Sequence, residues 1–275
     1  MRKVRANGVE LCIDEIGDPG DRPLLLIAGS GSSLDGWRPE LCERLAAGGR
    51  RVIRYDHRDT GQSTTYSPGQ PGYSGRDLTD DAVALLEALE VERADLVGIS
   101  MGGGIAQEIA LDHPERAASL TLVSTTFADR PYQEIPFPDG VEALAFDEPA
   151  PDWSDRDAVV AYMVAFERAL ASPARPFDEA TSREAAAEAV ERATDIAAIA
   201  NHDVMSHGDG PSGRLEELDV PALVIHGADD PMFPTGHGEA LATAIPGARL
   251  LVLDAVGHEL PPESWDRVVP AILAL

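Results

Sequence analysis

The sequence predicts an α/β fold in which a mainly parallel sheet is wrapped by helices on both faces. Three observations support this prediction: short continuous apolar runs, helical patterns between most of them, and one long segment in which the alternation stops. Strands that are covered on both faces read as unbroken apolar runs rather than as alternating ones. The apolar runs lie at residues 24–28, 52–55, 94–99, 120–123, 222–225 and 250–253. We therefore expect these runs to be strands of one sheet.

The chain begins with a predicted β-hairpin. Residues 3–6 and 9–13 flank Asn7-Gly8, a pair that favours a type I′ turn because both positions tolerate positive φ. The second strand alternates apolar and polar residues, so one of its faces is expected to contact water. Its alternating apolar residues are Val9, Leu11 and Ile13.

Helical patterns follow several of the strands. Residues 77–90 are expected to form a helix with Asp77 as its N-cap, because apolar residues recur on one face. That face carries Leu78, Ala82, Leu85, Leu86 and Leu89. Residues 101–112, 236–245 and 263–275 are also expected to be helical.

The alternation of strands and helices stops between about Thr126 and Leu218. Residues 130–140 are expected to form a loop, and helices are expected near 156–171 and over the alanine- and glutamate-rich stretch 178–200. An insertion at this point would lie over the carboxyl edge of the sheet, where a lid could cover a substrate. We therefore divide the chain into a core of residues 1–125 and 219–275 and a helical cap of residues 126–218.

One face of the helix near 156–171 is rich in methionine and aromatic residues. We interpret this stripe as packing, and the lining of a substrate pocket is the alternative. Its residues are Val159, Tyr162, Met163, Phe166 and Leu170.

Composition narrows the classes of partner. The chain has 275 residues, which suits one large domain carrying an insertion. With 48 acidic and 22 basic residues its formal charge is -26, so nucleic acids and anionic membrane surfaces are unlikely partners. Cys12 and Cys42 are too few for a disulfide framework and are expected to be buried thiols. The N-terminus lacks the apolar region of a signal peptide, and we expect a cytoplasmic protein that does not cross a membrane.

The stretch LVGISMGGG at residues 96–104 places one serine in a glycine-dense bend. Ser100 has Gly98 two residues before it and Gly102 two residues after it, between a predicted strand and a predicted helix. In a strand-turn-helix setting this G-x-S-x-G pattern is typical of a serine nucleophile held on a sharp turn. The glycines are needed because β-carbons at 98 or 102 would collide with neighbouring backbone.

A serine nucleophile needs a base, and the base needs an acid that orients it. Of the seven histidines, only His258 directly follows the last predicted strand, where open α/β sheets place groups that contact ligands. Asp229 and Asp230 both follow the preceding strand. We favour Asp230, because Pro231 biases it into an extended loop. The order Ser100, Asp230, His258 is the nucleophile-acid-base order of a catalytic triad on this kind of sheet.

A carbonyl group attacked by a serine becomes an oxyanion, which needs hydrogen-bond donors. We assign one to the backbone N–H of Met101, next to the nucleophile, and the second to the N–H of Ser30, in the glycine- and serine-rich loop after the strand at 24–28. The charged stretch RYDHRDTGQST contains Asp56 and Asp59, which we interpret as a hydrogen-bonded turn that supports the rim of the site rather than as catalytic residues.

A metal site is the less favoured interpretation of a second histidine- and aspartate-rich stretch, NHDVMSHGDG. Its potential ligands match no known spacing. They are His202, Asp203, His207 and Asp209. We therefore expect no metal and no cofactor.

Several stretches of the chain resemble the α/β-hydrolase superfamily. They are AGSGSSLDGW, RYDHRDTGQST, GISMGGG, ALDHPER, PALVIHGADDPMFP and VGHE. The resemblance covers most of the chain outside the insertion, and it implies a mostly parallel eight-stranded sheet with a helical cap. It implies the triad roles for Ser100, Asp230 and His258, with Ser30 and Met101 as oxyanion donors. Two of the stretches resemble the aclacinomycin methylesterase group, bacterial enzymes that remove a methyl ester from anthracycline polyketides.

The sequence thus predicts a serine hydrolase that cleaves a carboxylic ester of a small molecule through an acyl-enzyme. Two alternatives remain open. The same triad could serve a cofactor-free haloperoxidase or perhydrolase, or a C–C bond or lactone hydrolase, because function follows the contents of the pocket more than the fold. The fold could also serve as a non-catalytic receptor for a small molecule.

Overall fold

A single sheet organises the computed structural model, which describes residues 1–130 and 148–275. In these residues the sheet has eight strands in the order β1-β2-β4-β3-β5-β6-β7-β8. The strands are β1 (Arg2–Ala6), β2 (Val9–Ile16), β3 (Arg22–Ile27), β4 (Arg50–Tyr55), β5 (Ala94–Ile99), β6 (Ala117–Val123), β7 (Ala222–Gly227) and β8 (Arg249–Leu253). The predicted apolar runs lie within these strands, except that the run at 24–28 extends one residue, Ala28, past the end of β3. The predicted sheet is confirmed.

Along the sheet, β2 alone runs against the direction of the other strands. β1 pairs with β2, and β2 with β4, in the antiparallel sense, whereas β4, β3, β5, β6, β7 and β8 are mutually parallel. The hairpin turn has φ of 44° at Asn7 and 78° at Gly8, as the predicted type I′ turn requires. Because the carboxyl ends of the parallel strands meet at one edge, the loops after β3, β5, β7 and β8 converge there.

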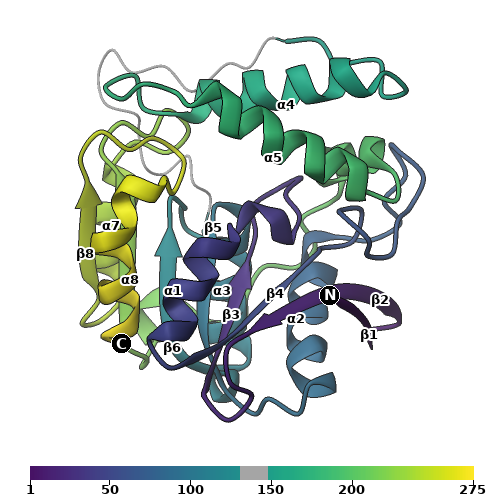
Figure 1. Ribbon diagram of the computed structural model, residues 1–275. Helices are drawn as coiled ribbons and strands as arrows, with labels where there is room; N and C mark the ends of the chain where they lie inside the picture. The colour runs from purple at the N-terminus through teal and green to yellow at the C-terminus, as the bar shows by residue number, and fades with distance from the viewer. Residues whose placement is uncertain (131–147) are drawn as a thin grey trace.

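Helices cover both faces of the sheet (Figure 1). Buried residues of α1 (Pro39–Ala47) and α8 (Trp265–Leu273) join one apolar cluster. Those of α2 (Gly75–Ala88), α3 (Met101–Asp112) and α7 (Gly236–Ala244) join the other. The sheet is thus covered on both sides, which explains the unbroken apolar character of its strands. Cys12 and Cys42 are free, buried thiols, as expected.

The predicted N-cap of α2 is corrected by the structure. The cap is Ser74, and Asp77 occupies the third helical position. There one carboxylate oxygen, Oδ2, accepts hydrogen bonds of 2.8 Å from both the backbone N–H and the hydroxyl of Ser74. An acidic residue suits the cap and the first turn equally well, so the sequence could not separate these two positions.

The segment after β6 contains α4 (Arg156–Leu170), α5 (Glu179–Arg192), a 3₁₀ turn η4 (Ile196–Ala200) and α6 (Asn201–Val204). α4 and α5 lie above the carboxyl edge of the sheet (Figure 1). They share a small apolar cluster of their own. Residues 131–140 of the predicted loop lie outside the described residues. In the described residues, the other short 3₁₀ turns are η1 (Leu34–Gly36), η2 (Pro114–Arg116), η5 (Leu215–Glu217) and η6 (Pro262–Ser264).

Two expectations for this segment are only partly right. The helix expected over 178–200 ends at Arg192, because the backbone N–H of Thr194 donates to the carbonyl of Gly61 at 2.8 Å and Asp195 caps a new turn. The expected stripe on α4 is buried at Val159, but its other members are only half-buried. The buried residues of α4 are Val159, Val160 and Val164.

None of the helices that the structure describes is both long enough and apolar enough to span a bilayer.

Candidate active site

Ser100 occupies the tight turn between β5 and α3. Its backbone has φ of 52° and ψ of -122°, a region that a non-glycine residue adopts only when its surroundings impose it. Its N–H donates to the carbonyl of Val123 at 3.0 Å, and its carbonyl accepts from the hydroxyl of Thr125 at 2.8 Å. The turn is therefore anchored on one side of the serine to the last residue of β6 and on the other to the chain just after it.

The glycines around Ser100 permit this turn for steric reasons. A β-carbon at Gly98 would lie 2.1 Å from the carbonyl oxygen of Gly102, and one at Gly102 would lie 2.2 Å from that of Ile27. Contacts this short exclude any side chain at either position. The predicted reason for the G-x-S-x-G spacing is thus confirmed by the geometry.

Asp230 and His258 meet at the same edge of the sheet, after β7 and β8 respectively. The imidazole Nδ1 of His258 lies 2.9 Å from Oδ2 of Asp230. The other oxygen, Oδ1, accepts the backbone N–H groups of Met232 at 2.9 Å and Phe233 at 2.8 Å. Both side chains are buried. The carboxylate is therefore fixed by its own loop, and it orients the ring.

The charge on Asp230 follows from these contacts. Burial raises the pKa of the Asp230 carboxyl, but the hydrogen bond and charge of His258, helped by the Phe233 N–H and His226, bring it below its ordinary value. An ionised carboxylate only accepts hydrogen bonds, so Nδ1 of His258 carries the proton. Its Nε2 is then the basic nitrogen, on the opposite side of the ring.

His226 lies beside this pair. Its side chain is fully buried, with Nε2 2.6 Å from the carbonyl oxygen of Phe233 and 3.6 Å from Oδ2 of Asp230. Burial lowers its pKa. The ring therefore supports the loop that holds Asp230.

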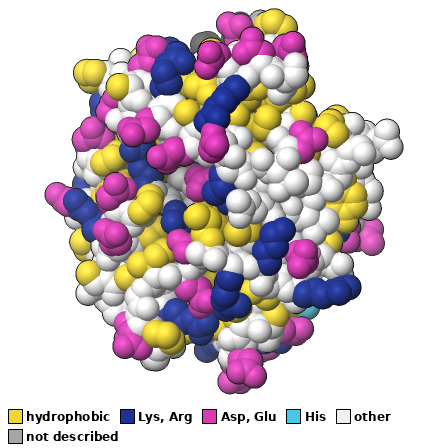
Figure 2. All heavy atoms as spheres, turned by 45° about the vertical axis from the view of Figure 1, so that its right-hand side comes forward, with side chains coloured by type: hydrophobic (Ala, Val, Ile, Leu, Met, Phe, Trp, Pro, Cys, Tyr) yellow, Lys and Arg dark blue, Asp and Glu magenta, His cyan; other side chains and the backbone are white. Residues whose placement is uncertain are grey.

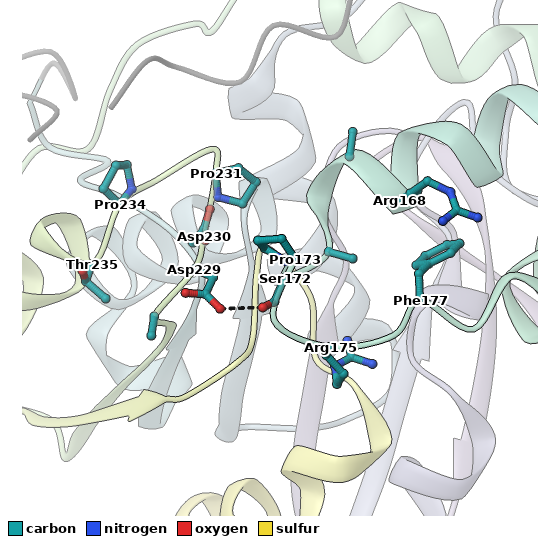
Figure 3. A pocket seen from close by; sticks show the side chains of 13 residues that line it. Arg168, Ser172, Pro173, Arg175, Phe177, Asp229, Asp230, Pro231, Pro234 and Thr235 are labelled. Carbon is teal, nitrogen blue, oxygen red and sulfur yellow. Dashed lines mark hydrogen bonds between the residues drawn. The ribbon is translucent and has the colours of Figure 1, made fainter. Parts of the chain in front are cut away.

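Asp229, the alternative acid, has a different partner. Its Oδ2 accepts the hydroxyl of Ser172 at 2.5 Å, as the dashed line in Figure 3 shows. Both aspartates line a pocket of about 780 Å³. Its other wall is the linker between α4 and α5, including Pro173 and Phe177. Of the two aspartates, Asp230 is the one that hydrogen-bonds to His258.

The loop after β3 lies beside the serine turn. A β-carbon at Gly29 would lie 3.5 Å from Cβ of Ser100. The N–H of Gly31 is bound to Nδ1 of His202 at 2.9 Å, and that of Ser32 to the carbonyl of Gly29 at 3.2 Å. Ser30 lies between Gly29 and Gly31 and is exposed. Met101 is the first residue of α3, where a helix leaves its N–H groups without partners of its own.

The turn after β4 supports the rim of the site, as interpreted from the sequence. Asp56 is fully buried and accepts the N–H groups of Leu34 and Gln62, both at 2.9 Å. Arg192, from the end of α5, forms two hydrogen bonds of 2.7 Å with the same carboxylate. Asp59 accepts the hydroxyl of Tyr73 at 2.7 Å. Both carboxylates are therefore engaged in structural hydrogen bonds.

Sequence reasoning missed the parts that Arg192 and His202 play in joining the segment after β6 to this rim. Arg192 lies in an alanine- and glutamate-rich helix with no distinguishing pattern, and its partner Asp56 is 136 residues away. The sequence offers His202 as a potential metal ligand, but in the structure its Nδ1 accepts the N–H of Gly31 and its Nε2 lies 2.9 Å from the carbonyl oxygen of Arg58. Among the described residues, no group of three or more potential ligands is placed to hold a metal ion.

Comparison with known proteins agrees with this architecture. Residues 22–264 match the family model of the alpha/beta hydrolase fold. Rhodomycin D methylesterase DauP of Streptomyces sp. (strain C5) is 34% identical over 99% of this chain and 97% of its own length. The 2-hydroxymuconate semialdehyde hydrolase of Pseudomonas sp. (strain CF600) is 32% identical over 94% of this chain and 87% of its own.

A solved structure is similar along the same length. The crystal structure of the enol-lactonase from Burkholderia xenovorans LB400 superimposes with a TM-score of 0.74, at 25% identity, over 99% of this chain and 98% of that one. The match in sequence and in structure covers the sheet, the serine turn and the loop of Asp230. The chain belongs to the α/β-hydrolase fold family.

Proposed function

We propose that this protein is a serine hydrolase of carboxylic esters, with Ser100 as nucleophile, His258 as general base and Asp230 as the acid that orients the base. The observation that carries the proposal is the hydrogen bond of 2.9 Å between His258 and Asp230, at the sheet edge where the strained turn presents Ser100. A buried carboxylate that orients an imidazole, at the sheet edge that also carries a serine on a strained turn, is what the activation of a serine hydroxyl needs.

The reaction proceeds in two halves. Oγ of Ser100 attacks the ester carbonyl carbon while Nε2 of His258 takes the hydroxyl proton. The tetrahedral oxyanion collapses, the bond from carbon to the alcohol oxygen breaks, and His258 protonates the departing alcohol. Water then attacks the acyl-enzyme, gives its proton to Nε2, and displaces Ser100, which recovers that proton as the carboxylic acid leaves.

The oxyanion is stabilised by the backbone N–H groups of Met101 and Ser30. The position of Met101 supports its assignment as a donor: it is the first residue of α3, where N–H groups point toward the serine turn. The second is supported by the neighbours of Ser30, because the N–H groups of Gly31 and Ser32 are already bound elsewhere.

The segment of residues 126–218 forms the cap over this site, and the core is made of residues 1–125 and 219–275. Two features support the division. α4 and α5 lie above the sheet edge (Figure 1), and the backbone N–H of His258 donates to the carbonyl of Leu170 at 2.8 Å. Arg168 and Ala169, at the end of α4, line the pocket beside Asp230.

The substrate is a methyl ester of a polyketide-like small molecule. The full-length identity of 34% to a rhodomycin D methylesterase supports this choice. Methyl ester cleavage needs the same two half-reactions, with methanol as the first product.

Replacement of the nucleophile tests the proposal. Ser100→Ala should lower the kcat for a short activated ester by about 10⁴- to 10⁶-fold, because the acyl-enzyme can no longer form. The matched control is Ser67→Ala, at an exposed serine, which should leave turnover unchanged. A fluorophosphonate probe should label Ser100 in the wild type, located by mass spectrometry of the modified peptide.

Other outcomes point to other functions. Full activity in Ser100→Ala would overturn the proposal. Absence of Ser100 labelling together with tight ligand binding would indicate a receptor. Turnover of a vinylogous 1,5-diketone or a lactone in preference to methyl esters would move the protein toward the C–C or lactone hydrolases, and peroxide-dependent halogenation in a carboxylate buffer would indicate a haloperoxidase.

A further inference from the structure

The loop that carries Ser30 is a tight turn whose shape is set by Gly31. The N–H of Ser32 donates to the carbonyl of Gly29 at 3.2 Å, and Gly31, the third residue of this turn, has φ of 67°. A positive φ at the third position is what a type II turn requires, and glycine supplies it without strain. The direction of the Ser30 N–H depends on this turn remaining in place.

A side chain from the segment after β6 forms a hydrogen bond with this turn. His202, the second residue of α6, accepts the N–H of Gly31 on Nδ1 at 2.9 Å. Its Nε2 lies 2.9 Å from the carbonyl oxygen of Arg58. An N–H only donates and a carbonyl only accepts, so these partners require a neutral ring with the proton on Nε2. His202 is buried, and burial lowers its pKa, which keeps the ring neutral.

Neighbouring residues hold His202 in position. The amide of Asn201 donates to Oδ2 of Asp59 at 2.8 Å, and its oxygen accepts the N–H of Gly69 at 2.6 Å. Ile199 lies against Gly31, with its Cβ 3.9 Å from where a β-carbon of Gly31 would be. The start of α6 is therefore tied to the core at several points, and the imidazole has little freedom.

A second imidazole holds the other end of the turn. Nε2 of His57 lies 3.1 Å from the carbonyl oxygen of Ala28. The rings of His57 and His202 meet edge to face, with centroids 6.0 Å apart. Gly29 and Ser30 thus lie between two backbone groups that are hydrogen-bonded to histidine rings, the carbonyl of Ala28 and the N–H of Gly31.

From these contacts we infer that His202 is a positioning residue for the oxyanion hole: by accepting the N–H of Gly31, it aims the N–H of Ser30 at the reacting oxygen. The inference rests on the proposed function and assigns to the cap a part in catalysis that is separate from substrate binding. A charged or missing acceptor at 202 frees Gly31, and the turn can then rotate the Ser30 N–H away from the oxyanion.

Two conservative variants separate the two hydrogen bonds of the ring. The amide oxygen of His202→Asn reaches the position of Nδ1 and still accepts from Gly31. The amide nitrogen of His202→Gln reaches the position of Nε2 and still donates to Arg58. His202→Asn should keep kcat within about 3-fold of wild type, whereas His202→Gln should lose about 10- to 100-fold in kcat with KM unchanged, because only transition-state stabilisation is lost.

The second readout is inhibition by an aryl trifluoromethyl ketone, whose adduct with a serine carries an oxyanion. Its inhibition constant should rise in His202→Gln by the same factor as kcat falls, and should stay near the wild-type value in His202→Asn. Thermal unfolding of both variants is measured alongside, because each loses one hydrogen bond of the ring and a purely structural role would affect both. The control is His113→Gln, because His113 is a partly exposed histidine that forms the N-cap of η2. This variant undergoes the same change of side chain and the same purification.

The inference is overturned if His202→Gln keeps the wild-type kcat and inhibition constant, or if both variants lose activity equally in proportion to their stability. Failure of the proposed function looks different. In that case wild-type turnover survives Ser100→Ala and no probe labels Ser100, whatever the His202 variants do.

Discussion

At the scale of single residues, the glycines of the serine turn are not equivalent. Gly98 and Gly102 leave no room for a β-carbon, whereas one added at Gly104 would have no atom within 4 Å. The first two are therefore required by the turn at Ser100, and the last is an ordinary helical position. The two aspartates after β7 differ in the same way, because only one of them has His258 as its partner.

Asp230→Asn should lower kcat by about 10⁴-fold, because an amide in place of the carboxylate permits the wrong tautomer of His258. Asp229→Asn is the matched control, one residue away and hydrogen-bonded to Ser172, and it should stay within about 3-fold of wild type. Steady-state kinetics with one activated ester compares the two. A large loss in Asp229→Asn with an intact Asp230→Asn would reverse the assignment of the acid.

Asp230 also ties stability to pH. Its pKa in the folded protein lies below the ordinary value, so the stabilisation from its charge is present above the unfolded-state pKa of about 3.9 and is lost as pH falls through the folded-state pKa. In urea titrations, the advantage of the wild type over Asp230→Asn should therefore be constant at neutral pH and shrink only below about pH 4.

At the scale of elements, the end of α5 is joined to the core by one buried ion pair. Arg192 is 12% exposed and Asp56 fully buried at the side chain, and Arg192 also reaches Asp35 at 2.6 Å. Asp56 accepts the N–H of Leu34 as well, so the carboxylate connects α5 to the chain that follows the turn at residues 29–32. A single side chain thus couples the position of α5 to the rim of the site.

Arg192→Met should lower the free energy of unfolding by about 3–5 kcal/mol, because it leaves the carboxylate of Asp56 buried without its partner. Arg183→Met is the control on the same helix. Its ion pair with Glu179 spans 3.7 Å between side chains that are 50% and 55% exposed, and its loss should cost at most about 0.5 kcal/mol. Urea unfolding measures both. Equal, small losses would show that α5 is held by apolar packing rather than by this pair.

At the scale of the whole molecule, the dominant property is negative charge. Acidic and basic side chains are interspersed over the face shown in Figure 2, but 48 acidic residues against 22 basic ones leave a net charge of -26. Self-repulsion of this size destabilises the compact state, and salt screens it.

Raising NaCl from about 20 mM to about 200 mM at pH 7 should raise Tm by about 2–4 °C, equivalent to about 1 kcal/mol. The control is the same titration near pH 4.4, the isoelectric point expected from the sequence, where little net charge remains to be screened. Calorimetry at both pH values provides the comparison. An equal rise at both would mean that salt acts through general exclusion from the surface.

The sequence by itself determined the sheet, the hairpin, the serine turn and the order of Ser100, Asp230 and His258. These features are encoded locally: an apolar run predicts a strand covered on both faces, an Asn-Gly pair tolerates the positive φ of a hairpin turn, and glycines two residues from a serine leave room for a sharp bend. Only the tertiary structure decided which residues stand opposite one another. His258 pairs with Asp230, 28 positions away, Arg192 with Asp56, 136 positions away, and His202 with Gly31, 171 positions away. Such hydrogen bonds exist only once the folded chain brings both partners together.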